Sequence, residues 1–259
     1  MKTVGVGGFG KAKLTTYKGR DAVVKYVNTA HSPEATLATC TKNRQDAKLE
    51  GEIQNLFNKE FVAEVYGIHG HAIYMRYYKD GSLRSQIDKG GANKRRYECA
   101  LDIIRGVKEI HRLNFIHSDI KASNVLVTKS IVNEGLLLCH ISDFGGARLK
   151  GFMPVCYTPG FVPANFFSKP LCFEDDIFSL GKLFLELFGQ FPQKKIKEIN
   201  YNNFFNYVSW KTFSNNYNES SDKEKCMQVM NLVHECINED STKRPLLGYL
   251  ESSFSNLIK

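Results

Sequence analysis

Two acids, one amide and one lysine stand in an order that could support phosphoryl transfer. Asp119, Lys121 and Asn124 fall in the run from Asn114 to Leu126, and Asp143 opens an Asp-Phe-Gly triplet. A carboxylate can accept a proton from a hydroxyl, a lysine can offset phosphoryl charge, and amide and carboxylate oxygens can bind Mg²⁺. Either tripeptide alone would fit a buried histidine or a loop aspartate, so the rest of the chain must decide.

A glycine-rich stretch near the beginning of the chain is a candidate phosphate-binding loop. It reads Gly5, Val6, Gly7, Gly8, Phe9, Gly10 and fits Gly-x-Gly-x-x-Gly, a pattern shared with dinucleotide sites. A dinucleotide site needs a helix directly after the glycines, whereas the residues after Gly10 read as a strand. The stretch therefore favours a β-hairpin, whose glycines let the backbone approach phosphate groups.

These patterns, taken in order, resemble the signature set of eukaryotic-type protein kinases. The resemblance extends from about Val4 to Leu257. It includes a strand lysine motif, the substrate-docking end of an activation segment, the start of a long buried helix and an Arg-Pro element near the C-terminus. These are, in the same order, Ala22-Val23-Val24-Lys25, Tyr157-Thr158-Pro159-Gly160-Phe161, Asp175-Asp176-Ile177 and Arg244-Pro245.

The resemblance implies roles for individual residues. Asp119 and Lys121 are expected to be catalytic, and Asn124 and Asp143 to hold Mg²⁺ or Mn²⁺. Glu52 is preferred to Glu50 as the partner of Lys25, because its neighbours Ile53 and Leu56 suit a helix packed on a sheet. The expected ATP-binding residues are Gly5, Val6, Gly7, Gly8, Phe9, Gly10, Ala12, Val23, Lys25, Glu52, Met75, Tyr77 and Leu126.

The fold implied is α+β with two lobes, and residues 1–259 form one protein kinase domain. The small lobe, about residues 1–78, is expected to be β-rich with one main helix around 46–58. The large lobe, about residues 79–259, is expected to be mostly helical. Within it, Ala100, Ile103, Ile104, Val107 and Ile110 form one apolar stripe and predict an amphipathic helix over 96–113. Residues 76–78 would be the hinge beside adenine, and Met75 would gate the pocket behind it.

The implied activity is ATP- and Mg²⁺-dependent phosphorylation of Ser/Thr hydroxyls in protein substrates, since Lys121 and Thr158 are typical of Ser/Thr kinases. A pseudokinase that binds nucleotide or partners without catalysis is the main alternative. A small-molecule kinase of related fold is a second one, but it would not be expected to keep Lys121 together with the Thr158-Pro159-Gly160-Phe161 segment.

The usual switch of such enzymes is missing from the sequence. Ser118 replaces the arginine that ordinarily pairs with a phosphate on the activation segment, and residues 146–157 contain no Ser or Thr. We therefore expect activity without activation-segment phosphorylation, with control by abundance or by an activating protein partner. Packing of the segment's apolar side chains is expected to hold it instead, through Leu149, Phe152, Met153, Pro154 and Val155.

Composition fits an ordinary globular protein. The chain has 259 residues, 42% of them hydrophobic, and a formal net charge of +8. Its basic clusters are short, so a nucleic-acid partner is disfavoured relative to protein substrates. No apolar run reaches membrane-spanning length, and seven scattered cysteines suggest a reducing compartment. The expected location is intracellular, cytoplasmic or nuclear, and in a host cell if the chain is virus-encoded.

Overall fold

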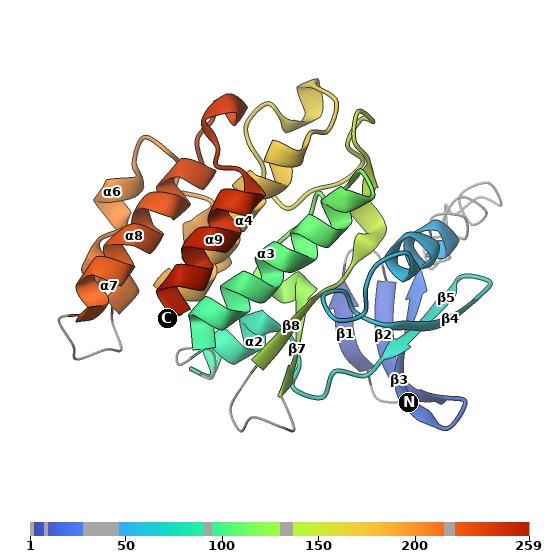
Figure 1. Ribbon diagram of the computed structural model, residues 1–259. Coiled ribbons are helices and arrows are strands. Elements are labelled where there is room, and N and C mark those ends of the chain that lie inside the picture. The colour runs from blue at the N-terminus through green and yellow to red at the C-terminus, as the bar shows by residue number, and fades with distance from the viewer. Residues whose placement is uncertain are drawn as a thin grey trace.

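The computed structural model describes residues 3–7, 10–27, 47–90, 95–129, 137–214 and 221–258. Gly8 and Phe9, both expected at the nucleotide, lie outside these ranges. The described residues form a sheet-based lobe and a larger helical lobe, which are joined after the last strand of the sheet (Figure 1). The predicted two-lobed α+β fold class is confirmed.

The small lobe is built on a five-stranded antiparallel sheet. Its strands are β1 (Thr3–Gly7), β2 (Gly10–Tyr17), β3 (Arg20–Val27), β4 (Val65–His69) and β5 (Ala72–Arg76), in the spatial order β1-β2-β3-β5-β4. Gly7 lies opposite Gly10, so the glycine stretch joins two paired strands, as a hairpin requires. Lys18 and Gly19 both have positive φ, the geometry of a tight hairpin turn whose twist matches that of the strands.

One helix, residues 47–55, packs on this sheet. Gly51 makes the close approach possible, because a Cβ there would lie 2.8 Å from a side-chain carbon of Ile68. On the sheet, Ala12 is opposite Lys25 and Val23 is opposite Met75. Since side chains alternate along a strand, these four residues share one face of the sheet.

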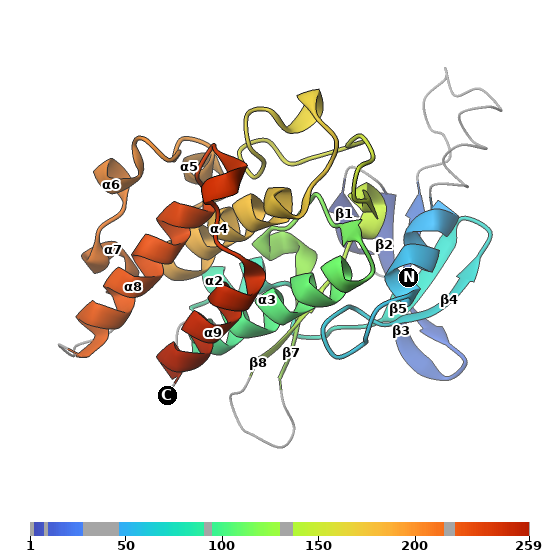
Figure 2. The ribbon, with the colours of Figure 1, turned by 45° about the horizontal axis from the view of Figure 1, so that its top comes forward.

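The large lobe is mostly helical, and the predicted helix over 96–113 is observed as α3 (Arg96–Arg112) with its apolar stripe buried. The next long helix, α4 (Phe173–Gly189), is buried along nearly its whole length and packs against α2 (Leu83–Asp88), α3 and α8 (Ser221–Cys236). Figure 2 shows α4 among these helices. The remaining helices are α5 (Gln193–Ile196), α6 (Phe204–Tyr207), α7 (Trp210–Ser214) and α9 (Leu247–Ile258).

Two short sheets carry the candidate catalytic residues. Strands β7 (Val125–Lys129) and β8 (Leu137–Ile141) form a hairpin, and β6 (Phe115–Ile116) pairs with β9 (Arg148–Leu149). The Ser142 N–H and hydroxyl both donate to the Asn124 carbonyl, each at 2.8 Å. The hairpin therefore brings Asn124 next to the residue that precedes Asp143.

Candidate active site

The four residues singled out by type and spacing come together between the lobes. Lys121 Nζ donates to Asp119 Oδ2 at 2.7 Å, and the Asn124 side-chain amide donates to the same oxygen at 2.8 Å. Thr158 donates its hydroxyl to Asp119 Oδ1 at 2.5 Å and accepts a bond from Lys121 at 2.6 Å. The Asp119 carboxylate is thus held in one orientation by three side chains, which suits a group that must receive a substrate hydroxyl.

A buried carboxylate on α4 fixes the start of the loop that carries Asp119. Asp176 accepts the backbone N–H groups of His117 and Ser118 at 2.9 and 3.0 Å, and its Oδ2 lies 2.9 Å from His111 Nε2. Burial alone would raise the pKa of Asp176, but these donors and the neighbouring histidines outweigh it and leave the pKa lowered. A charged anchor therefore sits beneath the loop.

Lys25 connects the two lobes through two carboxylates. Its Nζ donates to Glu50 Oε1 and to Asp143 Oδ1, both at 2.6 Å. Burial lowers the pKa of Lys25, but attraction to Asp143 and Glu50 outweighs it, so the net shift is upward. The pKa of Asp143 is lowered, because the Lys25 charge overcomes the effect of burial. Lys25 is therefore a fixed cation where phosphates would lie.

The prediction that Glu52 pairs with Lys25 is wrong, and Glu50 makes that contact. Glu50 is buried, whereas Glu52 is exposed and lies 3.5 Å from Lys48. Ile53 is buried as expected, but Leu56 is 56% exposed and does not mark the packed face. The buried positions repeat at helical spacing through Ala47, Glu50, Ile53 or Gln54, and Phe57; that repeat was the signal that could have identified Glu50.

The Asp-Phe-Gly triplet adopts a specific backbone and packing. Asp143 has φ 68° and ψ 71°, a left-handed conformation that is uncommon for a residue other than glycine. Phe144 is fully buried and packs against the rings of Phe57 and His117, with centroids 5.2 and 4.8 Å away. This packing holds Asp143 toward Lys25.

The residues expected to hold the metal have suitable donors. Asn124 uses its NH₂ group on the carbonyl and carboxylate of Asp119, so its amide oxygen is the atom left to serve as a ligand. An amide oxygen together with the Asp143 carboxylate matches the all-oxygen sites that Mg²⁺ prefers. In such a site the bound cation would offset the charge of the transferring phosphoryl group.

The other residues expected at the nucleotide lie around this centre. Ala12, Val23 and Met75 are partly exposed on the face of the sheet that carries Lys25, and Leu126 is partly exposed on β7. Met75 Sδ lies 3.6 Å from the side-chain nitrogen of Gln54, so the expected gating residue contacts helix 47–55. Tyr77 follows directly after β5, at the predicted hinge. Gly5, Val6, Gly7 and Gly10 lie on the paired strands β1 and β2.

The expectation that large apolar side chains hold the activation segment is wrong for most of them. Leu149, Phe152, Met153 and Val155 are 42–60% exposed, and only Pro154 is buried. Backbone bonds hold the segment instead: Lys150 N–H donates to Asn114 O, and the backbones of residues 151 and 152 exchange bonds with that of residue 171. The main chain makes these bonds without burying the side chains, since β9 pairs only through Arg148 and Leu149 and the residues after it are in no strand.

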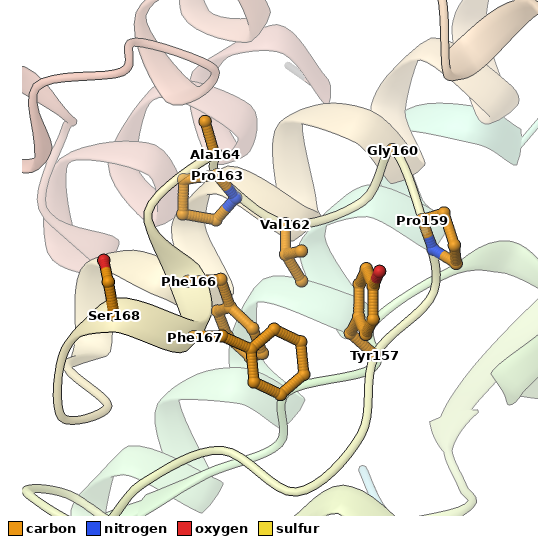
Figure 3. Close-up of a pocket in the computed structure, with 9 residues that line it drawn as sticks. All are labelled: Tyr157, Pro159, Gly160, Val162, Pro163, Ala164, Phe166, Phe167 and Ser168. Atoms are coloured by element: carbon orange, nitrogen blue, oxygen red, sulfur yellow. The ribbon is translucent and has the colours of Figure 1, made fainter.

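A mostly apolar hollow of about 450 Å³ lies directly beyond Thr158. Figure 3 shows the Val162 side chain directed toward the rings of Tyr157, Phe166 and Phe167. Tyr157 and Phe167 meet edge to face, with centroids 4.9 Å apart. Thr158, which lies between the lining residues Tyr157 and Pro159, bonds Asp119, so this hollow is next to the candidate catalytic aspartate.

Comparisons with known proteins agree with this geometry. A family model described as the protein kinase domain matches residues 1–251. The chain belongs to the protein kinase family. Kinase relatives include Mitogen-activated protein kinase kinase kinase 10 of Mus musculus, 28% identical over 74% of this chain and 22% of that protein. A second is RGS domain-containing serine/threonine-protein kinase A of Dictyostelium discoideum, 25% identical over 97% of this chain and 22% of that protein.

A third relative is shorter in its match: Eukaryotic translation initiation factor 2-alpha kinase 1 of Plasmodium falciparum, 30% identical over 46% of this chain and 8% of that protein. The kinase chain therefore spans 22% or less of the length of these three relatives. Among its described helices, none has the length and apolar character needed to cross a membrane.

Proposed function

We propose that this protein kinase is catalytically active and transfers the γ-phosphate of ATP, with Mg²⁺, to Ser/Thr hydroxyls of protein substrates. The observation that carries the proposal is the contact of one ammonium, Lys25, with both Glu50 and Asp143. In active kinases this lysine–glutamate pair and the metal-binding aspartate must both be in place. The proposal is supported by the contact of Lys25 with both carboxylates and by the bonds that hold Asp119.

Two features support Ser/Thr substrates. Lys121 and Thr158 both bond the Asp119 carboxylate, and these two residue types are typical of Ser/Thr kinases. The kinases of Mus musculus and Dictyostelium discoideum named above belong by name to protein kinases, and the latter to the serine/threonine class. We further propose that the apolar hollow beside Thr158 receives an apolar side chain of the substrate next to the phosphorylated residue.

Transfer of labelled phosphate from ATP to an arrayed peptide library tests this function. With Mg²⁺ present, Ser- and Thr-containing peptides should be labelled and Tyr-containing peptides should not, with preference for an apolar residue beside the acceptor. Asp143→Asn should abolish transfer and leave the melting temperature nearly unchanged, because it removes a charge from the metal site with little change in shape. Full activity in Asp143→Asn would contradict the assignment.

The alternative is a pseudokinase that binds nucleotide or partners without transfer. It would show a rise in melting temperature with ATP and Mg²⁺ but no labelled peptide under any condition. The chain lacks both the arginine before Asp119, where Ser118 stands, and a Ser or Thr in residues 146–157. This absence favours control through a protein partner and is compatible with both functions. An intracellular location, cytoplasmic or nuclear, remains part of the proposal.

A further inference from the structure

One buried acid of the large lobe has no role in the site described above. Glu186 lies on α4 with its side chain fully buried. Its Oε2 accepts the backbone N–H of Ala122 at 2.8 Å, while its Oε1 has no hydrogen-bond partner among the described residues. Burying a carboxylate costs free energy unless it is paired with a charge and its oxygens are hydrogen-bonded.

The surroundings of Glu186 compensate its charge only weakly. Arg84 Nη1 is 3.8 Å from Oε1, and the same guanidinium also bonds Asp88 and the Phe191 carbonyl. Burial raises the pKa of Glu186 to about 7, despite the Ala122 N–H, Arg84 and Lys121, while Asp88 raises it further. A buried carboxylate with so little compensation costs stability at neutral pH, so stability does not explain an acceptor at this position.

The position of Ala122 gives a reason. Ala122 directly follows Lys121, whose ammonium bonds Asp119 and Thr158. Asp176 and Glu186, both on α4, therefore accept backbone N–H groups of the catalytic loop at two points. Asp176 does so before Asp119, and Glu186 does so directly after Lys121. The backbone on either side of Lys121 is thus hydrogen-bonded to α4, which restricts the direction of the Lys121 side chain.

We propose that Glu186 is a positioning residue for phosphoryl transfer, acting through the Ala122 N–H to hold Lys121 against Asp119. This inference rests on the proposed kinase activity. Its contribution is to the rate of transfer, since a small displacement of a catalytic group costs rate even when binding is intact. ATP binding, which uses Lys25 and the sheet, should not depend on it.

The contact can be removed from either side. Glu186→Ala removes the acceptor, and Ala122→Pro removes the donor. Proline suits position 122, because Lys121 before it is extended (φ −163°, ψ 160°) and Ala122 begins a short 3₁₀ turn. Glu186→Gln keeps an acceptor, Ala122→Gly keeps the N–H, and Glu198→Ala removes an exposed acid that pairs with Lys195.

A double-mutant cycle on kcat is the test. Glu186→Ala and Ala122→Pro should each lower kcat about tenfold, as expected for loss of one buried bond to a charged group, with KM for ATP changed less than about twofold. Combined, they should lower kcat no further than either alone. Glu186→Gln, Ala122→Gly and Glu198→Ala should each retain about a third or more of the parent rate.

Two outcomes would overturn the inference: a parent-like rate in Ala122→Pro, or strictly additive losses in the double variant. Amide hydrogen exchange at Ala122 separates this from failure of the proposed function. It should be slow in the parent and in Glu186→Gln and faster in Glu186→Ala, whether or not the protein transfers phosphate. A parent enzyme without any transfer would contradict the proposed function itself, and unprotected exchange at Ala122 in the parent would contradict the contact.

Discussion

At the residue scale, the active site depends on how Lys25 divides its interactions. One ammonium lies 2.6 Å from both Glu50 and Asp143, and the three side chains come from β3, helix 47–55 and the loop after β8. Glu50 is buried and its pKa is raised by that burial, which Lys25 offsets only in part. Without Glu50, Lys25 would keep only its contact with Asp143 of the two. Its ammonium would then shift from the place where we expect it to bind phosphates.

The first prediction compares two glutamates of the same helix. Glu50→Gln should lower kcat/KM at least about tenfold, because it removes the charge that fixes Lys25. Glu52→Gln should change it by less than about twofold, because Glu52 makes only an exposed ion pair with Lys48. Steady-state kinetics on both purified variants measures this. Equal losses in the two variants would show that the helix, and not the contact with Lys25, matters.

The sequence could identify the candidate catalytic residues but not every partner. Asp119, Lys121, Asn124 and Asp143 were recognisable because their types and order are tied to the chemistry. Glu50 was not, since two glutamates two positions apart both fit a helix, and only the packed face of the helix distinguishes them. Glu186 gave no signal, because its partner is a backbone N–H, which any residue but proline would supply at position 122.

At the scale of elements, the activation segment is held by its main chain and its ends. The β6–β9 pairing and the backbone bonds to residues 114 and 171 fix its first half. Thr158, bonded to Asp119, fixes its far end. Ser118 is buried beside Gly146, and its uncharged hydroxyl supplies no cation for a phosphate on the segment. The contacts described hold both ends of the segment without a phosphate group.

The second prediction follows from that arrangement. Phosphatase-treated enzyme should keep its activity. Phe152→Ala should change kcat by less than about twofold, because the ring is 60% exposed and its removal opens no cavity. Thr158→Ser should keep most of the rate, and Thr158→Val should lose at least about tenfold because it removes the hydroxyl shared by Asp119 and Lys121. Peptide phosphorylation rates measure all four, and loss of activity on phosphatase treatment would overturn this account.

Elements differ in how far the sequence determines them. The helix α3 was predictable because five apolar residues fall on one stripe and all are buried. The short helices α5, α6 and α7 were not, because they depend on distant contacts. Phe204 is buried on α6, for example, and Tyr201 just before it stacks on His234 of α8 with centroids 4.1 Å apart. Four or five residues cannot form a stable helix without such tertiary packing.

At the scale of the whole molecule, α4 is the structural centre of the large lobe. It anchors the catalytic loop through Asp176, and its buried titratable side chains also include Glu186 and Lys182. Burial raises the pKa of Glu186 from 4.5 to about 7 and lowers the pKa of Lys182 from 10.5 to about 8. Lys182 donates to the carbonyls of Ile196 and Ile199, so it links α4 to the segment around α5. Because both pKa values are shifted, the free energy of unfolding should depend on pH through these two residues of α4.

The sign of each contribution follows from proton binding. Between pH 4.5 and about 7 the folded protein binds more protons at Glu186 than the unfolded chain, so Glu186 makes stability fall as pH rises. Between about 8 and 10.5 the folded protein binds fewer protons at Lys182, so Lys182 makes stability rise with pH. Each contribution is on the order of 3 kcal/mol for shifts of this size.

The third prediction is therefore a pair of opposite pH dependences, measured as differences from the parent so that all other titrating groups cancel. Relative to Glu186→Gln, the parent should lose about 3 kcal/mol of unfolding free energy between pH 4.5 and 7.5, because the buried carboxylate must ionise. Relative to Lys182→Met, it should gain a similar amount between pH 7.5 and 10.5. Urea unfolding at these pH values measures both differences. A Glu186→Gln difference that is the same at pH 4.5 and 7.5 would mean that Glu186 ionises in the folded protein as readily as in the unfolded chain, and that burial on α4 does not govern its charge.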